Sequence, residues 1–263
     1  MGMRSVRMWV SLVGLSILAI VILDFADRIF PGTRFDGTGS YALLGLISFG
    51  FMRWVRVSTN AYFAKPIFGW RFLVVLVLCG NLIVVQLRGE PFHNLSIGHW
   101  IRGVIFLFAV GATEEILSRG IVFGVLRIHG LPIAVIGSSL MFGLMHINRY
   151  IGEWDPWAAY FHVMSTFSFG LFACAIMVET RSIWVPIVFH TISNAGLIFE
   201  APPTKAEAAY RISIEFWRGV THPVLPFLTF AIPAAILFWI HAGTPVPQFV
   251  KRLAFRWGLL DQS

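Results

Sequence analysis

Two adjacent glutamates, Glu114 and Glu115, lie within an apolar stretch of the sequence, with Arg119 close behind them. A carboxylate at the depth of a bilayer costs about 2.5–3.5 kcal/mol on insertion scales, so such a cluster indicates a functional site. Glu115 and Arg119 are four residues apart, share a helix face and are expected to form an ion pair. Glu114 points about 100° away, which leaves its carboxylate available for chemistry.

Two further pairs of residues follow in separate apolar stretches, Phe142-x-x-x-His146 and His190-x-x-x-Asn194. The spacing predicts that Phe142 supports the site by walling the pocket of His146. It also predicts that His190 and Asn194 project into one cavity. A lone histidine in a membrane helix is more often a hydrogen-bonding residue than a catalytic one. Together with the glutamates, however, these residues favour a catalytic site.

One carboxylate, two imidazoles and an amide suit the hydrolysis of a peptide bond. Glu114 would act as general base on a water molecule, and a histidine would orient that water or protonate the leaving amine. His190 and Asn194 would donate hydrogen bonds to the developing oxyanion. Glu114, His146 and His190 are also possible zinc ligands. The sequence has no H-E-x-x-H motif, and the residues alone leave both alternatives open.

The composition is that of a membrane protein. Hydrophobic residues make up 57% of the 263 residues and charged residues 13%, and the mean hydropathy of +0.76 is too high for a soluble domain. The net charge of +7 comes from Lys and Arg in loops between apolar stretches, which predicts orientation in a membrane and no nucleic-acid partner. Cys79 and Cys174 are expected to be packing residues.

A spanning helix needs about 20 mostly apolar residues. We therefore expect an all-α, multi-pass membrane protein of about eight transmembrane helices, forming one membrane-embedded domain over 1–263. The expected spans are 8–23, 41–55, 70–87, 99–128, 131–148, 157–178, 182–199 and 222–241. The first is expected to be retained and not cleaved as a signal peptide. The basic stretch from Arg53 to Arg71 falls on the side of the N-terminus, so both termini are expected to be cytoplasmic.

The three motifs, in this order and on separate apolar helices, resemble the CPBP family. This family contains the CAAX prenyl proteases of the Rce1 type and bacterial relatives named for bacteriocin processing or abortive infection. Its pattern is E-E-x-x-x-R, then F-x-x-x-H, then H-x-x-x-N or H-x-x-x-D. The sequence supplies T-E-E-I-L-S-R, F-G-L-M-H and H-T-I-S-N. The resemblance covers about Val110 to Leu197, within a motif-bearing core of about 99–199.

The resemblance implies an eight-helix intramembrane endopeptidase with a catalytic cavity open to the membrane and to water. It implies a glutamate-activated water without a cofactor, with Zn²⁺ as the alternative. The implied catalytic residues are Glu114, His146, His190 and Asn194, with Glu115 and Arg119 as supporting residues. The substrate would be a peptide or lipidated protein in the lipid bilayer, such as a prenylated CAAX-type C-terminus or a leader peptide.

Two other classes of function remain open. Buried ionisable residues also form proton relays in membrane transporters, although the broken helices or paired halves of many transporters are not evident in the sequence. A non-catalytic immunity or scaffold protein could keep the same polar cluster. The compact size is associated with the inner membrane of a prokaryotic cell.

Overall fold

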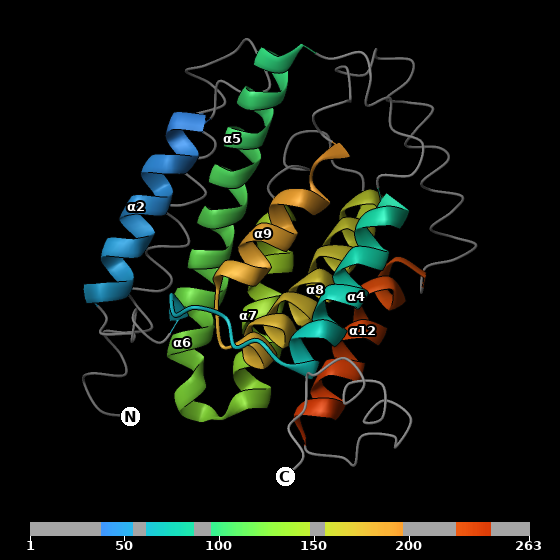
Figure 1. The fold of residues 1–263 in the computed structure, drawn as a ribbon. Helices are drawn as coiled ribbons and strands as arrows, with labels where there is room; N and C mark the ends of the chain where they lie inside the picture. Colours follow the sequence, from blue (N-terminus) through green and yellow to red (C-terminus); the bar gives the residue numbers. More distant parts are fainter. Residues whose placement is uncertain (1–37, 55–61, 87–95, 148–155, 197–224, 243–263) are drawn as a thin grey trace.

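The computed structural model describes residues 38–54, 62–86, 96–147, 156–196 and 225–242. Within these ranges the chain is helical and contains no strand (Figure 1), which confirms the all-α class for this part of the chain. The main helices are α2 (Thr38–Trp54), α4 (Trp70–Gln86), α5 (Ile97–Glu115), α7 (Leu131–Met145), α8 (Pro156–Thr180), α9 (Trp184–Ser193) and α12 (Leu225–His241). These coincide with seven of the expected segments, and the expected span 8–23 lies outside the described residues.

The helix that carries the glutamates begins the longest helical stretch among the described residues. Ser96 caps its start by accepting a hydrogen bond from the backbone N–H of His99. α5 then continues into a π-helical stretch, Ile116–Val122, which leads into α6 (Phe123–Leu126). π-Helical stretches are rare in proteins, and those that occur are often found at functional sites. Gly130, with a positive φ of 106°, ends the helical run after a short 3₁₀ turn and lets α7 fold back beside α6.

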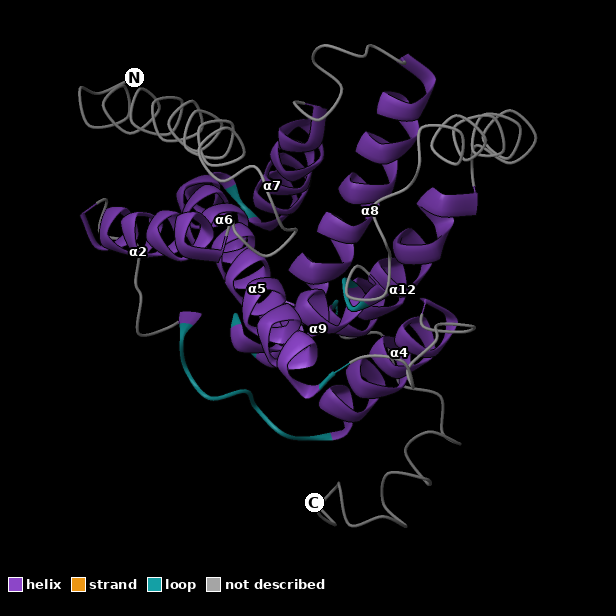
Figure 2. Ribbon diagram, turned by 90° about the horizontal axis from the view of Figure 1, so that it is seen from above, coloured by secondary structure: helices purple, strands orange, loops and turns teal. Residues whose placement is uncertain are grey.

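α8 lies at the centre of one half of the bundle. It packs against α4, α7, α9 and α12, while α5 packs against α2 and α9 (Figure 2). Two glycines bring α7 and α8 close together. A Cβ on Gly170 would lie 2.9 Å from both Cα and Cβ of Ser139, and a Cβ on Gly143 would lie 2.9 Å from the carbonyl oxygen of Val163. The close approach of α7 and α8 therefore depends on glycine, which has no side chain, at these two positions.

The outer surface of the bundle is apolar. Large side chains that are more than half exposed occur on several helices, among them Leu46, Val84, Ile136 and Trp239. Such a surface suits lipid better than water. The stretch Ala159–Thr180 of α8 is the one described helix that is long and apolar enough by itself to cross a membrane. The helical segments are thus present, whereas eight membrane spans stay a prediction.

The turn between α8 and α9 is held by the segment that precedes α4. The backbone N–H of Ile67 donates to the carbonyl of Thr180 over 3.0 Å, and that of Ile183 donates to the carbonyl of Tyr62 over 2.8 Å. The hydroxyl of Ser182 donates to the carbonyl of Ala64 over 2.7 Å. These bonds fix the start of α9, the helix that carries His190.

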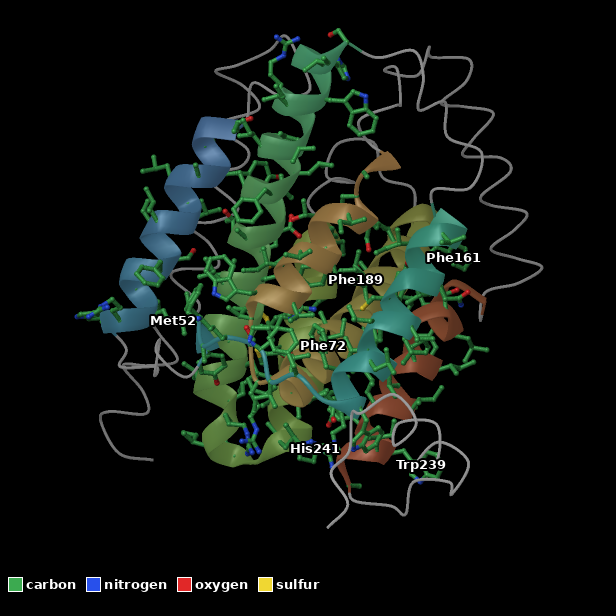
Figure 3. All side chains as sticks on the ribbon, viewed as in Figure 1. Met52, Phe72, Phe161, Phe189, Trp239 and His241 are labelled. Atoms are coloured by element: carbon green, nitrogen blue, oxygen red, sulfur yellow. The ribbon has the colours of Figure 1, made fainter. Side chains whose placement is uncertain are left out.

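A buried carboxylate joins three helices near the same end of α8. Glu179, whose side chain is 1% exposed, contacts Arg71 of α4 over 3.4 Å and Nδ1 of His241 over 2.7 Å. His241 lies with Trp239 near the end of α12 (Figure 3). Because the partners come from separate helices, this cluster ties α4 and α12 to α8.

Candidate active site

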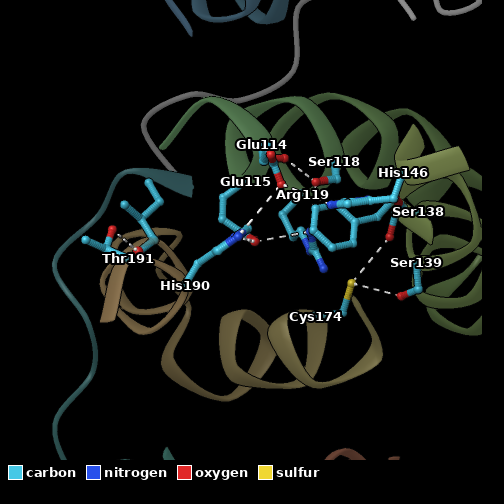
Figure 4. A network of polar contacts seen from close by, with 12 residues as sticks. Glu114, Glu115, Ser118, Arg119, Ser138, Ser139, His146, Cys174, His190 and Thr191 are labelled. Atoms are coloured by element: carbon cyan, nitrogen blue, oxygen red, sulfur yellow. Dashed lines mark hydrogen bonds and ion pairs between the residues drawn. The ribbon is translucent and has the colours of Figure 1, made fainter. Parts of the chain in front are cut away.

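The two glutamates at the end of α5 differ in their surroundings. The side chain of Glu114 is 16% exposed, whereas that of Glu115 is fully buried. The two side chains leave the helix in different directions (Figure 4), as the angular step of a helix predicts. One carboxylate is thus enclosed by protein and the other lies at a partly open position.

The ion pair expected between Glu115 and Arg119 is present. Nη1 of Arg119 lies 3.2 Å from Oε1 of Glu115, and neither side chain is exposed. The same Nη1 donates to the hydroxyl of Ser118 over 2.8 Å, and that hydroxyl donates to the backbone carbonyl of Glu114. Ser118 therefore links the buried arginine to the backbone of Glu114.

His190 reaches both glutamates from α9. Its Nδ1 lies 2.9 Å from Oε1 of Glu115, and its Nε2 lies 3.8 Å from Oε2 of Glu114. Because a carboxylate can only accept, Nδ1 carries the proton of this bond. The Glu115 carboxylate thus fixes the orientation of the imidazole and directs its other nitrogen at Glu114.

His146 approaches the same carboxylate from the end of α7. Its Nδ1 donates to the backbone carbonyl of Phe142 over 2.8 Å, which places the proton on Nδ1 and leaves Nε2 as an acceptor in the neutral ring. Nε2 lies 3.8 Å from Oε2 of Glu114. His146 and His190 therefore each present Nε2 to the same oxygen, as drawn in Figure 4.

Oε2 of Glu114 is a buried acceptor beside two imidazole nitrogens. This oxygen is buried and has no hydrogen-bond partner within the described part of the chain. The separations of 3.8 Å to the two imidazoles are too long for direct hydrogen bonds. A bridging water would satisfy all three groups. The arrangement can hold a water next to a carboxylate able to remove its proton.

Residues 96–196 match the family model described as type II CAAX prenyl endopeptidase Rce1-like. The chain contains an Rce1-like domain. The Rce1-like proteins are a family of membrane proteases, so the resemblance read from the three motifs is confirmed. The match contains all three motifs, while α2, α4 and α12 lie outside it. No curated protein matches the sequence.

Phe142 has a wider role in the Rce1-like domain than its spacing indicated. Its ring lies 4.9 Å from the ring of His146, as expected, and 5.9 Å from that of His190. The guanidinium carbon of Arg119 lies 4.4 Å from the same ring centroid, a favourable cation–π distance. Phe142 therefore packs against one residue of each motif.

Asn194 lies just beyond the end of α9, whereas the spacing placed it on the same helix as His190. α9 ends at Ser193, and Asn194 is its C-terminal cap residue, with its backbone N–H donating to the carbonyl of His190 over 3.1 Å. The structure gives no hydrogen bond between its side-chain amide and the described residues of the site. The role of Asn194 in holding an oxyanion stays a prediction.

The donor set at the centre of the Rce1-like domain is one carboxylate and two imidazoles, a combination that zinc accepts. However, no group of three or more His, Cys, Asp or Glu side chains within the described ranges is arranged to hold a metal ion. The alternative zinc site formed by Glu114, His146 and His190 therefore depends on a solution test.

The structure also places Cys79 and Cys174 as buried free thiols, in agreement with their expected role in packing.

Sequence reasoning missed two features of this site. Ser118 was not singled out, although a hydroxyl inside the E-E-x-x-x-R motif is a possible signal for a contact with the arginine. His162 of α8 belongs to none of the three motifs, yet its ring lies 5.1 Å from that of His146. The sequence carries no spacing signal for this contact, because the two residues are on different helices.

Proposed function

We propose that the chain is an intramembrane endopeptidase that hydrolyses a peptide bond of a membrane-associated substrate with a water activated by Glu114. The observation that carries the proposal is the convergence of Oε2 of Glu114 with Nε2 of His146 and Nε2 of His190, 3.8 Å from each. This geometry provides a base, a water position and two oriented imidazoles at one point.

The hydrogen bonds give the two imidazoles separate roles. His146 uses its Nδ1 proton on the carbonyl of Phe142, so its Nε2 accepts a hydrogen bond from the water. In this mechanism His190 acts with a proton on each nitrogen. In that form Nδ1–H donates to Glu115, and Nε2–H donates to the oxyanion of the substrate.

The reaction involves two proton transfers, one to Glu114 and one from it. Glu114 removes a proton from the water while the water oxygen bonds to the carbonyl carbon of the scissile peptide. The electron pair of the C=O bond moves to the oxygen, where His190 and, by the family resemblance, Asn194 donate hydrogen bonds. The C–N bond then breaks as the protonated Glu114 returns its proton to the leaving nitrogen. The electron pair on the oxyanion re-forms the C=O bond, so the products are a carboxylic acid, which keeps the second proton of the water, and an amine.

The substrate class follows from the family description together with the site. A type II CAAX prenyl endopeptidase acts on a prenylated C-terminal peptide, and the apolar outer surface of this bundle suits a substrate held in lipid. A leader peptide is the second candidate. We place both termini in the cytoplasm and the helices across the inner membrane of a prokaryotic cell, with Zn²⁺ in the catalytic centre as the alternative to direct glutamate catalysis.

The test is cleavage of a peptide panel by the purified full chain. The panel contains farnesylated C-a-a-X peptides, their unprenylated counterparts and bacterial leader peptides. Because a general base contributes about 10²–10⁴-fold, Glu114→Gln is expected to lose at least 100-fold in kcat while keeping the wild-type Tm. A fully active Glu114→Gln variant would overturn the assignment of the base. A chain that cleaves none of the peptides would count against the protease and in favour of a relay or binding protein.

A further inference from the structure

His146 lies at the C-terminal end of α7. α7 ends at Met145, and His146 is the cap residue that follows it. Its side chain is 23% exposed, compared with 6% for His190. Helix ends fray more readily than helix interiors. The hydrogen bond of its Nδ1 to the carbonyl of Phe142 comes from the same helix end, so contacts from another helix help to keep Nε2 directed at Glu114.

Among the described residues, two rings contact the imidazole of His146. The ring of Phe142, on the same helix, lies 4.9 Å away at 64°. The ring of His162, on α8, lies 5.1 Å away at 70°. Edge-to-face contacts at these separations are a preferred geometry for aromatic rings. His162 therefore holds the catalytic imidazole from outside α7, where fraying of the helix end does not affect it.

The face of α8 that carries His162 also contacts the second imidazole. Phe169 is seven residues further along and therefore on the same helix face. Its ring lies 4.8 Å from that of His190. Gly170, next to it, lets Nη2 of Arg119 approach to within 3.2 Å of the place where a Cβ would be. One face of α8 thus supports both imidazoles, His146 through His162 and His190 through Phe169.

We propose that His162 is a positioning residue for peptide hydrolysis, whose ring keeps Nε2 of His146 directed at the water beside Glu114. This inference rests on the proposed function. In this role His162 acts through His146. Without the ring of His162, the imidazole of His146 can turn away from the water. A misplacement of about 1 Å lowers the rate on the order of 10²-fold. Because the ring acts on the chemical step through His146, KM is expected to stay unchanged.

The kinetic test compares two variants of His162 with a control on the same helix. His162→Ala is expected to lower kcat about 10–100-fold with KM unchanged. His162→Phe, which keeps an aromatic ring, is expected to restore most of the rate. Tyr160→Ala removes a side chain that is 48% exposed from the same turn of α8 and is expected to leave kcat unchanged. Wild-type kcat in His162→Ala, or failure of His162→Phe to restore the rate, would overturn the inference.

A second measurement does not depend on cleavage. In the chain labelled with ¹³C-histidine, the ring resonance of His146 is identified by its loss in His146→Gln. This resonance is expected to shift and broaden in His162→Ala but not in Tyr160→Ala. An unchanged resonance would overturn the inference whether or not any peptide is cleaved. A shifted resonance in a chain that cleaves nothing would preserve the contact but overturn the protease function, and with it the role of His162 in hydrolysis.

Discussion

Nδ1 of His190 donates a hydrogen bond to Oε1 of Glu115 over 2.9 Å, across a separation of 75 residues in sequence. The same carboxylate oxygen accepts a hydrogen bond from Arg119. Glu115 thus has two tasks, because it neutralises a buried arginine and orients an imidazole that faces Glu114. The second glutamate of the motif is bound into the site through both contacts, and its loss should affect stability and activity together.

The first prediction concerns Glu115 and Arg119. Glu115→Gln leaves the Arg119 guanidinium uncompensated where neither side chain is exposed, and breaking such a pair costs about 3–5 kcal/mol. Tm of the detergent-solubilised protein is therefore expected to fall. The double variant Glu115→Gln/Arg119→Met removes both charges and should regain part of that Tm without regaining activity, because His190 still lacks its carboxylate. A wild-type Tm in Glu115→Gln would disprove the importance of the pair.

The second prediction concerns Asn194. If its amide donates to the oxyanion, Asn194→Ala should lower kcat about 10²–10³-fold. Its side chain has no described hydrogen bond with the rest of the site, so Tm should change little. Asn194→Asp, which keeps the shape and matches the H-x-x-x-D form of the motif, is the control for the size of the side chain. A kcat close to that of the wild type in Asn194→Ala would remove Asn194 from the oxyanion site.

The third prediction concerns the contact between α7 and α8. In Gly170→Ala the new Cβ would lie 2.9 Å from Cα and Cβ of Ser139 and 3.2 Å from Nη2 of Arg119. Overpacking of this kind costs about 1–3 kcal/mol, so both Tm and activity should decrease. Gly80→Ala is the matched control, because no atom of the described residues lies within 4 Å of its Cβ position. Equal Tm values for the two variants would show that α7 and α8 are not closely packed at Gly170.

The fourth prediction concerns metal. If Glu114 acts directly on water, treatment of the purified chain with EDTA, followed by its removal, should leave kcat unchanged. Metal analysis of the active protein should then find less than one zinc ion per chain. Loss of activity in the chelator and its recovery with added Zn²⁺ would instead establish a zinc site, with Glu114, His146 and His190 as the residues to replace first.

Most helices could be located from the sequence because the signal is local. Apolar stretches of the right length produced α4, α7 and α8 within a few residues of their expected bounds. The ion pair between Glu115 and Arg119 could be foreseen for the same reason, since two residues four apart share a face of any helix. The end of α9 before Asn194 was not foreseen, because the exact last residue of a helix depends on capping and packing.

What the sequence by itself determined is therefore the helices of the described residues, the polar residues they carry and, through three short motifs, the Rce1-like domain. Tertiary structure alone decided which of those residues meet. The contacts of His190 with Glu115, of Arg119 with Phe142 and of His162 with His146 each join different helices. Their partners depend on how side chains interdigitate as α5, α7, α8 and α9 pack, and helical periodicity within one segment carries no information about the rotation of a neighbouring helix.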